Sequence, residues 1–258
     1  MRSSTLRALA FAVVCTNPIA SAAAELVFNT QDFAPFNYQI DGVVSGPAAE
    51  IIRQVCQEME ITCTFQLLPW KRAQEEVRAG KANAMFVIGW NEKRAKWLHF
   101  SPPIMNTEYG FFVKDDNPLK YSQLSDIQGY TVGVYGPSNT ANSLNKIKNE
   151  MEKTNLNPIK IDMRPDDEAG FKKLSLGRLN AVFSNRDVGH SLIAKLNLTG
   201  KVRYAGASKR LKYYIGFAQE HNEKDLIDRF NSTYLALYKR GTIKEILDRH
   251  NMEVATLE

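Results

Sequence analysis

The sequence of 258 residues has few of the residue types that build metal or redox sites. It contains three cysteines and four histidines, and the histidines are widely separated along the chain: His99, His190, His221 and His250. Metal sites usually gather such residues at short, characteristic spacings. The sequence therefore predicts neither a metal site nor a bound cofactor.

Long apolar runs and strong charge are also missing. No stretch after the N-terminus approaches the ~20 apolar residues that cross a membrane as a helix. The net charge is only +5, and basic residues alternate with acidic ones, as in residues 146–153. That alternation is typical of a solvated helical face, whereas a nucleic-acid-binding protein usually carries a basic stripe or a known module. We expect no nucleic-acid partner.

The N-terminus has the pattern of a cleavable signal peptide. A positive region, a short apolar stretch and a run of small residues follow one another: Arg2 and Arg7, residues 8–14, and Ala22, Ala23 and Ala24. Cys15 could suggest a lipoprotein, but Val14 precedes it where a small residue is required. We expect cleavage after residue 24 and export to the periplasm. Removing 24 of the 258 residues takes away two arginines and lowers the net charge from +5 to +3.

The mature chain keeps one pair of cysteines, Cys56 and Cys63. Six residues separate them, too many for a CxxC redox motif, and an even pair in an exported chain predicts a disulfide. A bridge that closes so small a loop stabilises the fold by about 2–3 kcal/mol.

Strand and helix patterns alternate along the chain, which predicts an α/β fold. Strands are expected at 26–29, 63–67, 83–88, 130–135, 159–163, 180–183 and 213–217. Helices are expected after Pro47, around residues 70–77, from a cap at Ser138, over 168–176 and 187–196, and up to Gly241, where Thr242 and Glu245 predict a capping box for a last helix.

The order of these elements predicts two α/β units without a flexible linker. One comprises residues 25–106 together with 214–258, and the other residues 107–213. Crossings near 106–109 and 209–214 would join them, with the C-terminal tail returning to the first unit.

Six short motifs follow one another in an order known from one family. They are Ala34-Pro35-Phe36 with Asp41-Gly42 and Gly46; Gly80-Lys81-Ala82-Asn83-Ala84; Glu92-Lys93-Arg94 with Phe100-Ser101-Pro102-Pro103; Leu124, Gly129 and Val132-Gly133-Val134; Gly177-Arg178-Leu179-Asn180-Ala181-Val182; and Arg240-Gly241-Thr242. Together they resemble the bacterial periplasmic solute-binding proteins of family 3, which serve amino-acid ABC transporters. The resemblance covers nearly all of the mature chain.

Two local features refine the resemblance. The spacing of Cys56 and Cys63, followed by Thr64-Phe65, is similar to the disulfide of the histidine-binding and lysine/arginine/ornithine-binding members. Pro69-Trp70-Lys71-Arg72-Ala73 resembles a subgroup with a Pro-Trp-x-Arg-Ala motif, whose ligands are generally unassigned.

The resemblance implies a two-lobed periplasmic binding protein fold (Venus flytrap, type II), with a mixed sheet flanked by helices in each lobe. Such a protein closes on a small molecule, acts as a monomer and hands its ligand to an inner-membrane ABC permease. It recognises a ligand and does not convert it.

Arg94 matches the position that binds the ligand's carboxylate in the family, and its planar guanidinium can grip both carboxylate oxygens. It could instead be a surface arginine paired with Glu92 or Glu58. Backbone donors should complete the grip at Ser138, Asn139 and Thr140, because a helix N-terminus favours an anion. A plain N-cap is compatible with that role.

Phe33 and Trp70 match the aromatic walls of the family's pocket, although both could simply belong to the core of the first lobe. Arg72 either enters the cleft as a second cation or lies exposed beside Glu75 and Glu76. Val87, Ile88 and Gly89 stand where the family has small hydroxyl residues, and we expect Ile88 and Gly89 to border the ligand.

One departure from the family pattern concerns the ligand itself. Amino-acid-binding members hold the ammonium group with an aspartate of the second lobe, and here that position is Asn185. A neutral amide offers only dipoles to a cation. We therefore expect a carboxylate-bearing ligand and leave open an amino acid, an acid without an α-ammonium group, a modified amino acid or a peptide-like molecule.

Two other functions stay open. A cyclohexadienyl dehydratase resembles the same family, so the chain could be a lyase, which would need a general acid among Glu50, Glu108 and Asp187. It could also deliver a ligand signal to a membrane receptor.

Overall fold

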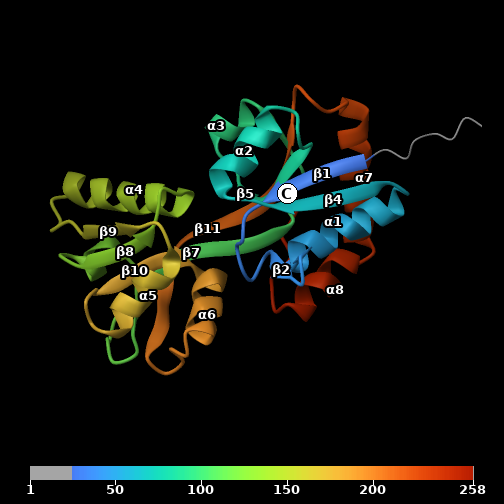
Figure 1. The fold of residues 1–258 in the computed structure, drawn as a ribbon. Coiled ribbons are helices and arrows are strands. Elements are labelled where there is room, and N and C mark those ends of the chain that lie inside the picture. The colour runs from blue at the N-terminus through green and yellow to red at the C-terminus, as the bar shows by residue number, and fades with distance from the viewer. Residues whose placement is uncertain (1–24, 258) are drawn as a thin grey trace, which may run out of the picture.

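The computed structural model of the protein describes residues 25–257, which fold into two bodies joined by two long strands (Figure 1). The predicted signal peptide lies outside the described residues. Between residues 25 and 257, no helix combines the length and the apolar character needed to cross a membrane.

A single hydrogen-bonded sheet runs through both bodies, with its strands in the order β4-β1-β5-β11-β7-β10-β8-β9 and β6 paired to β11. β1 and β4 are parallel, as are β8 and β9, whereas β11 is antiparallel to β5 and β7, so the sheet is mixed. The strands are β1 (Glu25–Thr30), β4 (Thr62–Leu67), β5 (Ala84–Gly89), β6 (Leu98–Phe100), β7 (Met105–Lys114), β8 (Thr131–Tyr135), β9 (Lys160–Arg164), β10 (Ala181–Asn185) and β11 (Val202–Ala218), with a separate hairpin of β2 (Tyr38–Ile40) and β3 (Val43–Ser45).

β7 and β11 connect the two bodies (Figure 1). They pair from Met105 opposite Tyr213 to Lys114 opposite Val202. The crossings expected near 106–109 and 209–214 lie inside these strands, and the strand expected at 213–217 is only the last part of β11. The register of β11 against β7 shifts between residues 204 and 206 and again between 207 and 209. Extended backbone, rather than a loop, therefore links the bodies.

The first lobe surrounds β1, β4 and β5 and contains both the N-terminal and the C-terminal helices. These helices are α1 (Pro47–Glu58), α2 (Trp70–Arg78), α3 (Glu92–Ala95), α7 (Lys224–Lys239) and α8 (Thr242–Arg249). α7 buries Ile227, Phe230, Tyr234 and Leu237, which are spaced three and four residues apart and therefore form one apolar face.

The capping box expected at the start of α8 was wrong. Gly241 is the N-cap in the left-handed region (φ 86°), and no side chain caps the helix. Because Gly241 turns the chain directly from α7 into α8, Thr242 is already helical and cannot cap.

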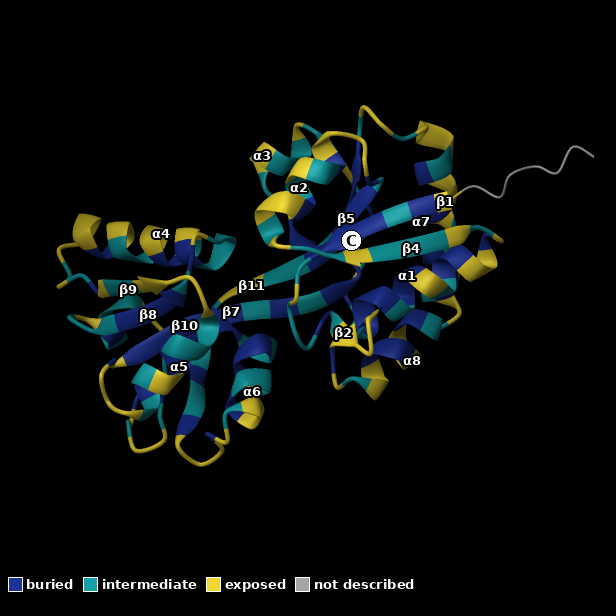
Figure 2. Cartoon of the chain, in the orientation of Figure 1, coloured by how far each residue is buried: buried dark blue, intermediate teal, exposed yellow. Residues whose placement is uncertain are grey.

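The second lobe packs around β8, β9 and β10 and has its own core (Figure 2). Its helices are the 3₁₀ helix η1 (Leu124–Ile127), α4 (Asn139–Lys153), α5 (Asp167–Ser175) and α6 (Arg186–Lys195). Phe111 and Phe183 meet at 4.9 Å between ring centroids, and Phe112 and Phe171 at 5.2 Å. Each lobe thus has a hydrophobic core that can hold it together while the other moves.

The predicted disulfide is confirmed. Cys56, in the last turns of α1, is bonded to Cys63 at the start of β4. The bridge fixes the helix to the strand that follows it, on the side of the first lobe opposite the second.

Candidate functional site

A cleft lies between the lobes, at the ends of β5 and β8 and beside the crossing strands. About 560 Å³ of space free of protein atoms lies between its walls, and this space is open to solvent. Its lining is Thr30, Gln31, Phe33, Trp70, Phe86, Val87, Gly89, Arg94, Tyr109, Tyr135, Pro137, Ser138, Asn139, Thr140 and Tyr213. Both lobes therefore contribute to one site.

Arg94 lies in this cleft and is held by the loop before it. α3 begins after Asn91, whose side-chain Oδ1 accepts a hydrogen bond from the Arg94 backbone N–H at 2.9 Å. The guanidinium Nη1 donates to the Gly89 carbonyl at 2.8 Å, and the guanidinium carbon lies 5.3 Å from the centre of the Trp70 ring. A guanidinium has five N–H donors, so most of them remain available to a ligand.

No described carboxylate pairs with Arg94. Glu58, one of the alternative partners, is bound to Arg240 instead. Burial lowers the pKa of Arg94, and the nearby hydroxyl groups of Tyr109 and Tyr213 only partly oppose that change. A half-buried cation without a described counter-ion in its cleft is favourably placed to bind an anion.

The start of α4 forms the opposite wall. Ser138 is the predicted N-cap, and this is confirmed: its Oγ accepts from the Ala141 N–H at 3.0 Å and donates to the Tyr135 carbonyl at 2.7 Å. Asn139 and Thr140, which carry the first N–H groups of the helix, line the cleft together with Ser138. A Cβ built on Gly89 would lie 3.7 Å from Asn139 Nδ2, so the two lobes approach closely here.

Aromatic side chains close the cleft on several sides. Phe33 and Trp70 line it, as expected, and Phe33 also packs against Tyr213 with ring centroids 6.0 Å apart. The sequence interpretation missed Tyr109, Tyr135 and Tyr213. Tyr135 could have been found, because it ends a parallel strand just before a capped helix, and ligands bind where such strands end.

β5 presents backbone to the cleft through a bulge. β11 pairs Tyr214 with Ile88 and Ile215 with Phe86, so it skips Val87. Val87 has φ 57°, a strained value for a β-branched residue, and it lines the cleft. Ile88 points the other way and packs in the core beside α2, so it lies outside the lining.

Arg72 also lies outside the cleft. Its side chain is 66% exposed and forms an ion pair with Glu76 one helical turn further along α2, at 2.8 Å. Of the two alternatives for this residue, the structure has the exposed one.

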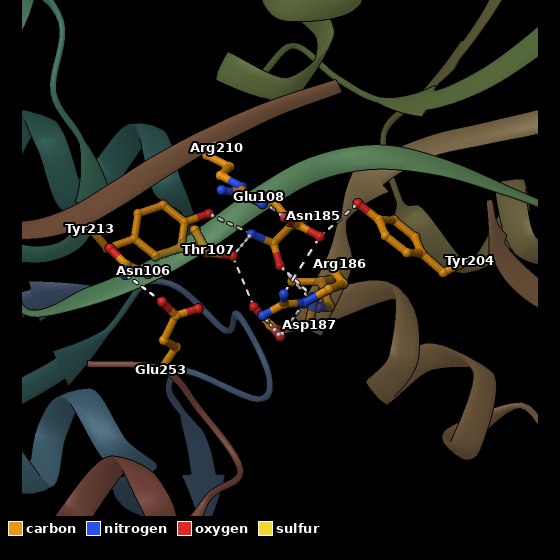
Figure 3. A network of polar contacts seen from close by, with 11 residues as sticks. Asn106, Thr107, Glu108, Asn185, Arg186, Asp187, Tyr204, Arg210, Tyr213 and Glu253 are labelled. Carbon is orange, nitrogen blue, oxygen red and sulfur yellow. Dashed lines mark hydrogen bonds and ion pairs between the residues drawn. The ribbon is translucent and has the colours of Figure 1, made fainter. Parts of the chain in front are cut away.

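Asn185 lies behind the cleft, in a polar network between β7, β10, β11 and α6 (Figure 3). It is 2% exposed. Its Nδ2 donates to Thr107 Oγ1 at 2.7 Å and to Tyr213 Oη at 3.2 Å, while its Oδ1 accepts from the N–H groups of Asp187 and Val188. Every hydrogen-bonding position of the amide is thus occupied within the protein, and none faces a ligand ammonium group.

The three carboxylates considered as a general acid do not line the cleft. Glu50 pairs with Arg249 and His250 on the outside of the first lobe. Glu108 and Asp187 are engaged with Arg186 in the network of Figure 3. Within residues 25–257 no group of three or more His, Cys, Asp or Glu side chains could hold a metal ion.

Asp167 is an unusual carboxyl group in the wall behind Tyr135. Burial raises its pKa to about 6, partly opposed by a hydrogen bond from Ser184. A raised carboxyl pKa means that the folded state binds the proton more tightly than the unfolded state, whose pKa is about 3.9. The free energy of unfolding should therefore fall as the pH rises from 4 to 6.

Asp167→Asn is expected to remove this fall and to stabilise the protein at pH 7.5 by on the order of 1–2 kcal/mol, allowing for the lost carboxylate at the helix N-terminus. Urea unfolding of the mature protein between pH 4 and 7.5 measures the effect. Asp115→Asn, at an exposed aspartate, is the control. A slope that persists in Asp167→Asn would assign it to another group.

The chain matches one known protein family over nearly its whole described length. The profile of the bacterial extracellular solute-binding proteins, family 3, matches residues 26–253. The chain belongs to this family. The resemblance read from the motifs is thereby confirmed, although the Pro-Trp-x-Arg-Ala subgroup is not tested by this match.

Two relatives show what this solute-binding protein is similar to. It is 25% identical over 227 residues to the probable amino-acid-binding protein YxeM of Bacillus subtilis, covering 87% of this chain and 82% of that one. It is 21% identical over 219 residues to the L-cystine-binding protein TcyJ of Escherichia coli K12, covering 84% and 78%.

Solved structures share the two-lobed fold. A structure from work on glutathione import via GshT and the cystine ABC importer TcyBC of Streptococcus mutans has a TM-score of 0.76 at 20% identity, covering 91% of this chain and 98% of that one. A histidine kinase sensor domain has a TM-score of 0.73 at 21% identity, covering 87% and 94%. An ancestral amino-acid-binding protein, a precursor of cyclohexadienyl dehydratase, has 0.71 at 17%, covering 87% and 94%.

Proposed function

We propose that this solute-binding protein captures a small carboxylate-bearing ligand between its lobes, with Arg94 as the carboxylate-binding residue. The observation that carries the proposal is a half-buried guanidinium in the interlobe cleft, held by the Gly89 carbonyl and without a carboxylate partner among the described residues. The N-terminus of α4 supplies backbone N–H donors from the facing lobe, so closure would surround the anion.

The proposal divides the mature chain into a first lobe of residues 25–106 and 214–258 and a second lobe of residues 107–213. The separate hydrophobic cores of the two bodies support this division. Export through the signal peptide, monomeric action in the periplasm and delivery to an ABC permease complete the proposal, in line with the extracellular family to which the chain belongs.

The ligand is an amino acid or a related acid. YxeM and TcyJ favour an amino acid through their names, and the glutathione-import structure favours a peptide-like molecule. Asn185, whose amide is fully hydrogen-bonded within the protein, gives no support to recognition of an α-ammonium group.

Binding without turnover is the function we propose over catalysis or sensing. The dehydratase precursor and the sensor domain share only the fold at their low identity. In this chain Glu50, Glu108 and Asp187 lie away from the cleft lining, which leaves none of the considered acids next to a ligand bound at Arg94.

A thermal-shift screen of the mature protein tests the proposal. Amino acids, N-acetylated amino acids, simple carboxylic acids and short peptides are each compared with the matching amide, which lacks the carboxylate. A ligand at a hundred times its dissociation constant stabilises by about 2.7 kcal/mol, or roughly 5–10 °C in a chain of this size. If carboxylates as a class give no shift, or if their amides shift the protein equally, the proposal fails. Product formation during incubation would show an enzyme instead.

A further inference from the structure

The cleft continues outward into a wider groove, which we call the outer groove. It lies between α2 and α3 of the first lobe and α4 and the crossing strand β11, and it shares Trp70, Arg94 and Tyr109 with the inner cleft. It holds about 2490 Å³ of space open to solvent, against about 560 Å³ in the inner cleft. A ligand longer than a single amino acid could extend into it from Arg94.

The lining of the outer groove is strongly basic. It includes eight lysine and arginine side chains and a single carboxylate, that of Glu92. This contrasts with the chain as a whole, in which 33 basic residues are nearly balanced by 28 acidic ones. The excess of positive charge is therefore concentrated at this groove.

Three of the lysines have no ion pair with any residue from 25 to 257, and they come from three sides of the groove. Lys93 lies on α3, Lys146 on α4 and Lys209 on β11, and all three are exposed. Two other basic residues of the lining do have acidic partners, in the pairs Lys71–Glu75 and Arg210–Glu108. The groove thus presents cations that the protein itself does not neutralise.

The unpaired lysines of the outer groove would oppose closure of the lobes. Lys93 belongs to the first lobe and Lys146 to the second, so closing would bring like charges toward one another across the groove. Like charges repel more strongly as the distance shortens and water is removed. A ligand with negative charge in the groove would reverse the sign of this contribution and favour the closed state.

An exposed aromatic side chain adds a planar surface to the same groove. Trp90 lines the groove and is 57% exposed. Nearby, Trp97 is covered by the guanidinium of Arg78, whose central carbon lies 3.9 Å from the ring centre. Trp90 has no such cover among the described residues, and its face can pack against the amide or methylene groups of a ligand.

We propose that the outer groove is a second anion-binding subsite, so that the ligand is an elongated acid with at least two acidic groups. One carboxylate binds Arg94 in the inner cleft, and a second acidic group lies among Lys93, Lys146 and Lys209. This inference rests on the proposed function, since it extends the ligand held by Arg94. A dicarboxylic acid and a short acidic peptide share this chemistry.

The test compares probes that differ in one acidic group. Pimelate is paired with its monoamide, and the dipeptide Ala-Glu with Ala-Gln, in calorimetric titrations of the mature protein at low salt and at 150 mM salt. In at least one pair the probe with the additional acid should bind about tenfold more tightly at low salt, and less so at 150 mM, because exposed ion pairs are individually weak and screened. The pair that responds identifies the source as a simple diacid or a peptide.

Variants locate the second acidic group. The triple variant Lys93→Gln, Lys146→Gln, Lys209→Gln should abolish the preference for the additional acid and leave the affinity for the monoamide or Ala-Gln within about twofold. The control Lys148→Gln, Lys153→Gln, Lys160→Gln removes the same charge outside the groove and should keep the preference.

The outcomes separate this inference from the proposed function. If the additional acid brings no gain, or if both triple variants act alike, the second subsite is overturned while binding at Arg94 stands. If no probe binds at all, the inference is overturned, and the carboxylate screen then decides the proposed function by itself.

Discussion

Arg94→Ala is expected to weaken binding of the carboxylate ligand by at least about 100-fold, which corresponds to roughly 2.7 kcal/mol. The guanidinium lies in the cleft without a described counter-ion, so the ligand carboxylate is its natural partner, and the bidentate contact is lost with the side chain. Arg94→Lys should recover only part of the affinity, because an ammonium group cannot form the planar fork. Titration calorimetry with the ligand found in the screen measures both variants.

The unliganded fold of Arg94→Ala should be as stable as the wild type or slightly more stable, because the substitution removes a desolvated charge and one hydrogen bond to Gly89. Arg72→Ala is the matched control, since Arg72 lies on α2 outside the cleft and is paired with Glu76 on the surface. Its affinity should stay within about twofold. Full affinity in Arg94→Ala would move the carboxylate site elsewhere.

Asn185→Asp restores the family's aspartate, yet it is expected to destabilise the protein by about 2–4 kcal/mol at pH 7.5. Both N–H donors of the amide are used, toward Thr107 and Tyr213. A carboxylate there would face the Thr107 oxygen as a second acceptor, and Asp187 already accepts the hydrogen bond of that hydroxyl. Arg186 of the same network already pairs with Glu108 and Asp187, so the substitution buries a charge without a cation of its own.

The pH dependence follows from the same burial. The new carboxyl group would have a raised pKa in the folded state, so the destabilisation should be nearly absent at pH 4 and complete near neutrality. Urea unfolding at pH 4 and pH 7.5 measures this difference. Asn180→Asp is the control, because Asn180 is exposed and uses only its acceptor, toward the Thr131 N–H. Equal stability of Asn185→Asp and wild type at pH 7.5 would show that the network can rearrange around a charge.

The sequence predicted the local elements of this fold better than their connections. Apolar periodicity located α1, and the serine at 138 marked the start of α4, because such signals act over a few residues. The sequence did not predict the full length of β7 and β11. Within residues 202–212 only Val202 and Ala205 are buried and most other side chains are half-buried, so the strand lacks the continuous apolar run that marked β5.

The residues of the candidate site likewise fall into those that short motifs predicted and those that only the tertiary fold brings together. Arg94 and the start of α4 were accessible through short motifs, whereas Tyr109 and Tyr213 enter the cleft through pairing of strands about a hundred residues apart. Asn185 was identified as a departure from the family, but its role was not, since the partners that occupy its amide come from β7 and β11. Contacts of that kind depend on the tertiary fold.

The uninterrupted sheet through both lobes has a consequence for affinity. If closing requires the β7–β11 ribbon to bend, the free energy of that bending enters every measured dissociation constant, in proportion to how rarely the unliganded protein is closed. The register shifts near residues 204–209 are where the ribbon is least regular. Substitutions there are expected to change the dissociation constant severalfold without changing any residue that contacts the ligand. The affinity of this protein therefore depends on the stiffness of its connecting strands as well as on its pocket.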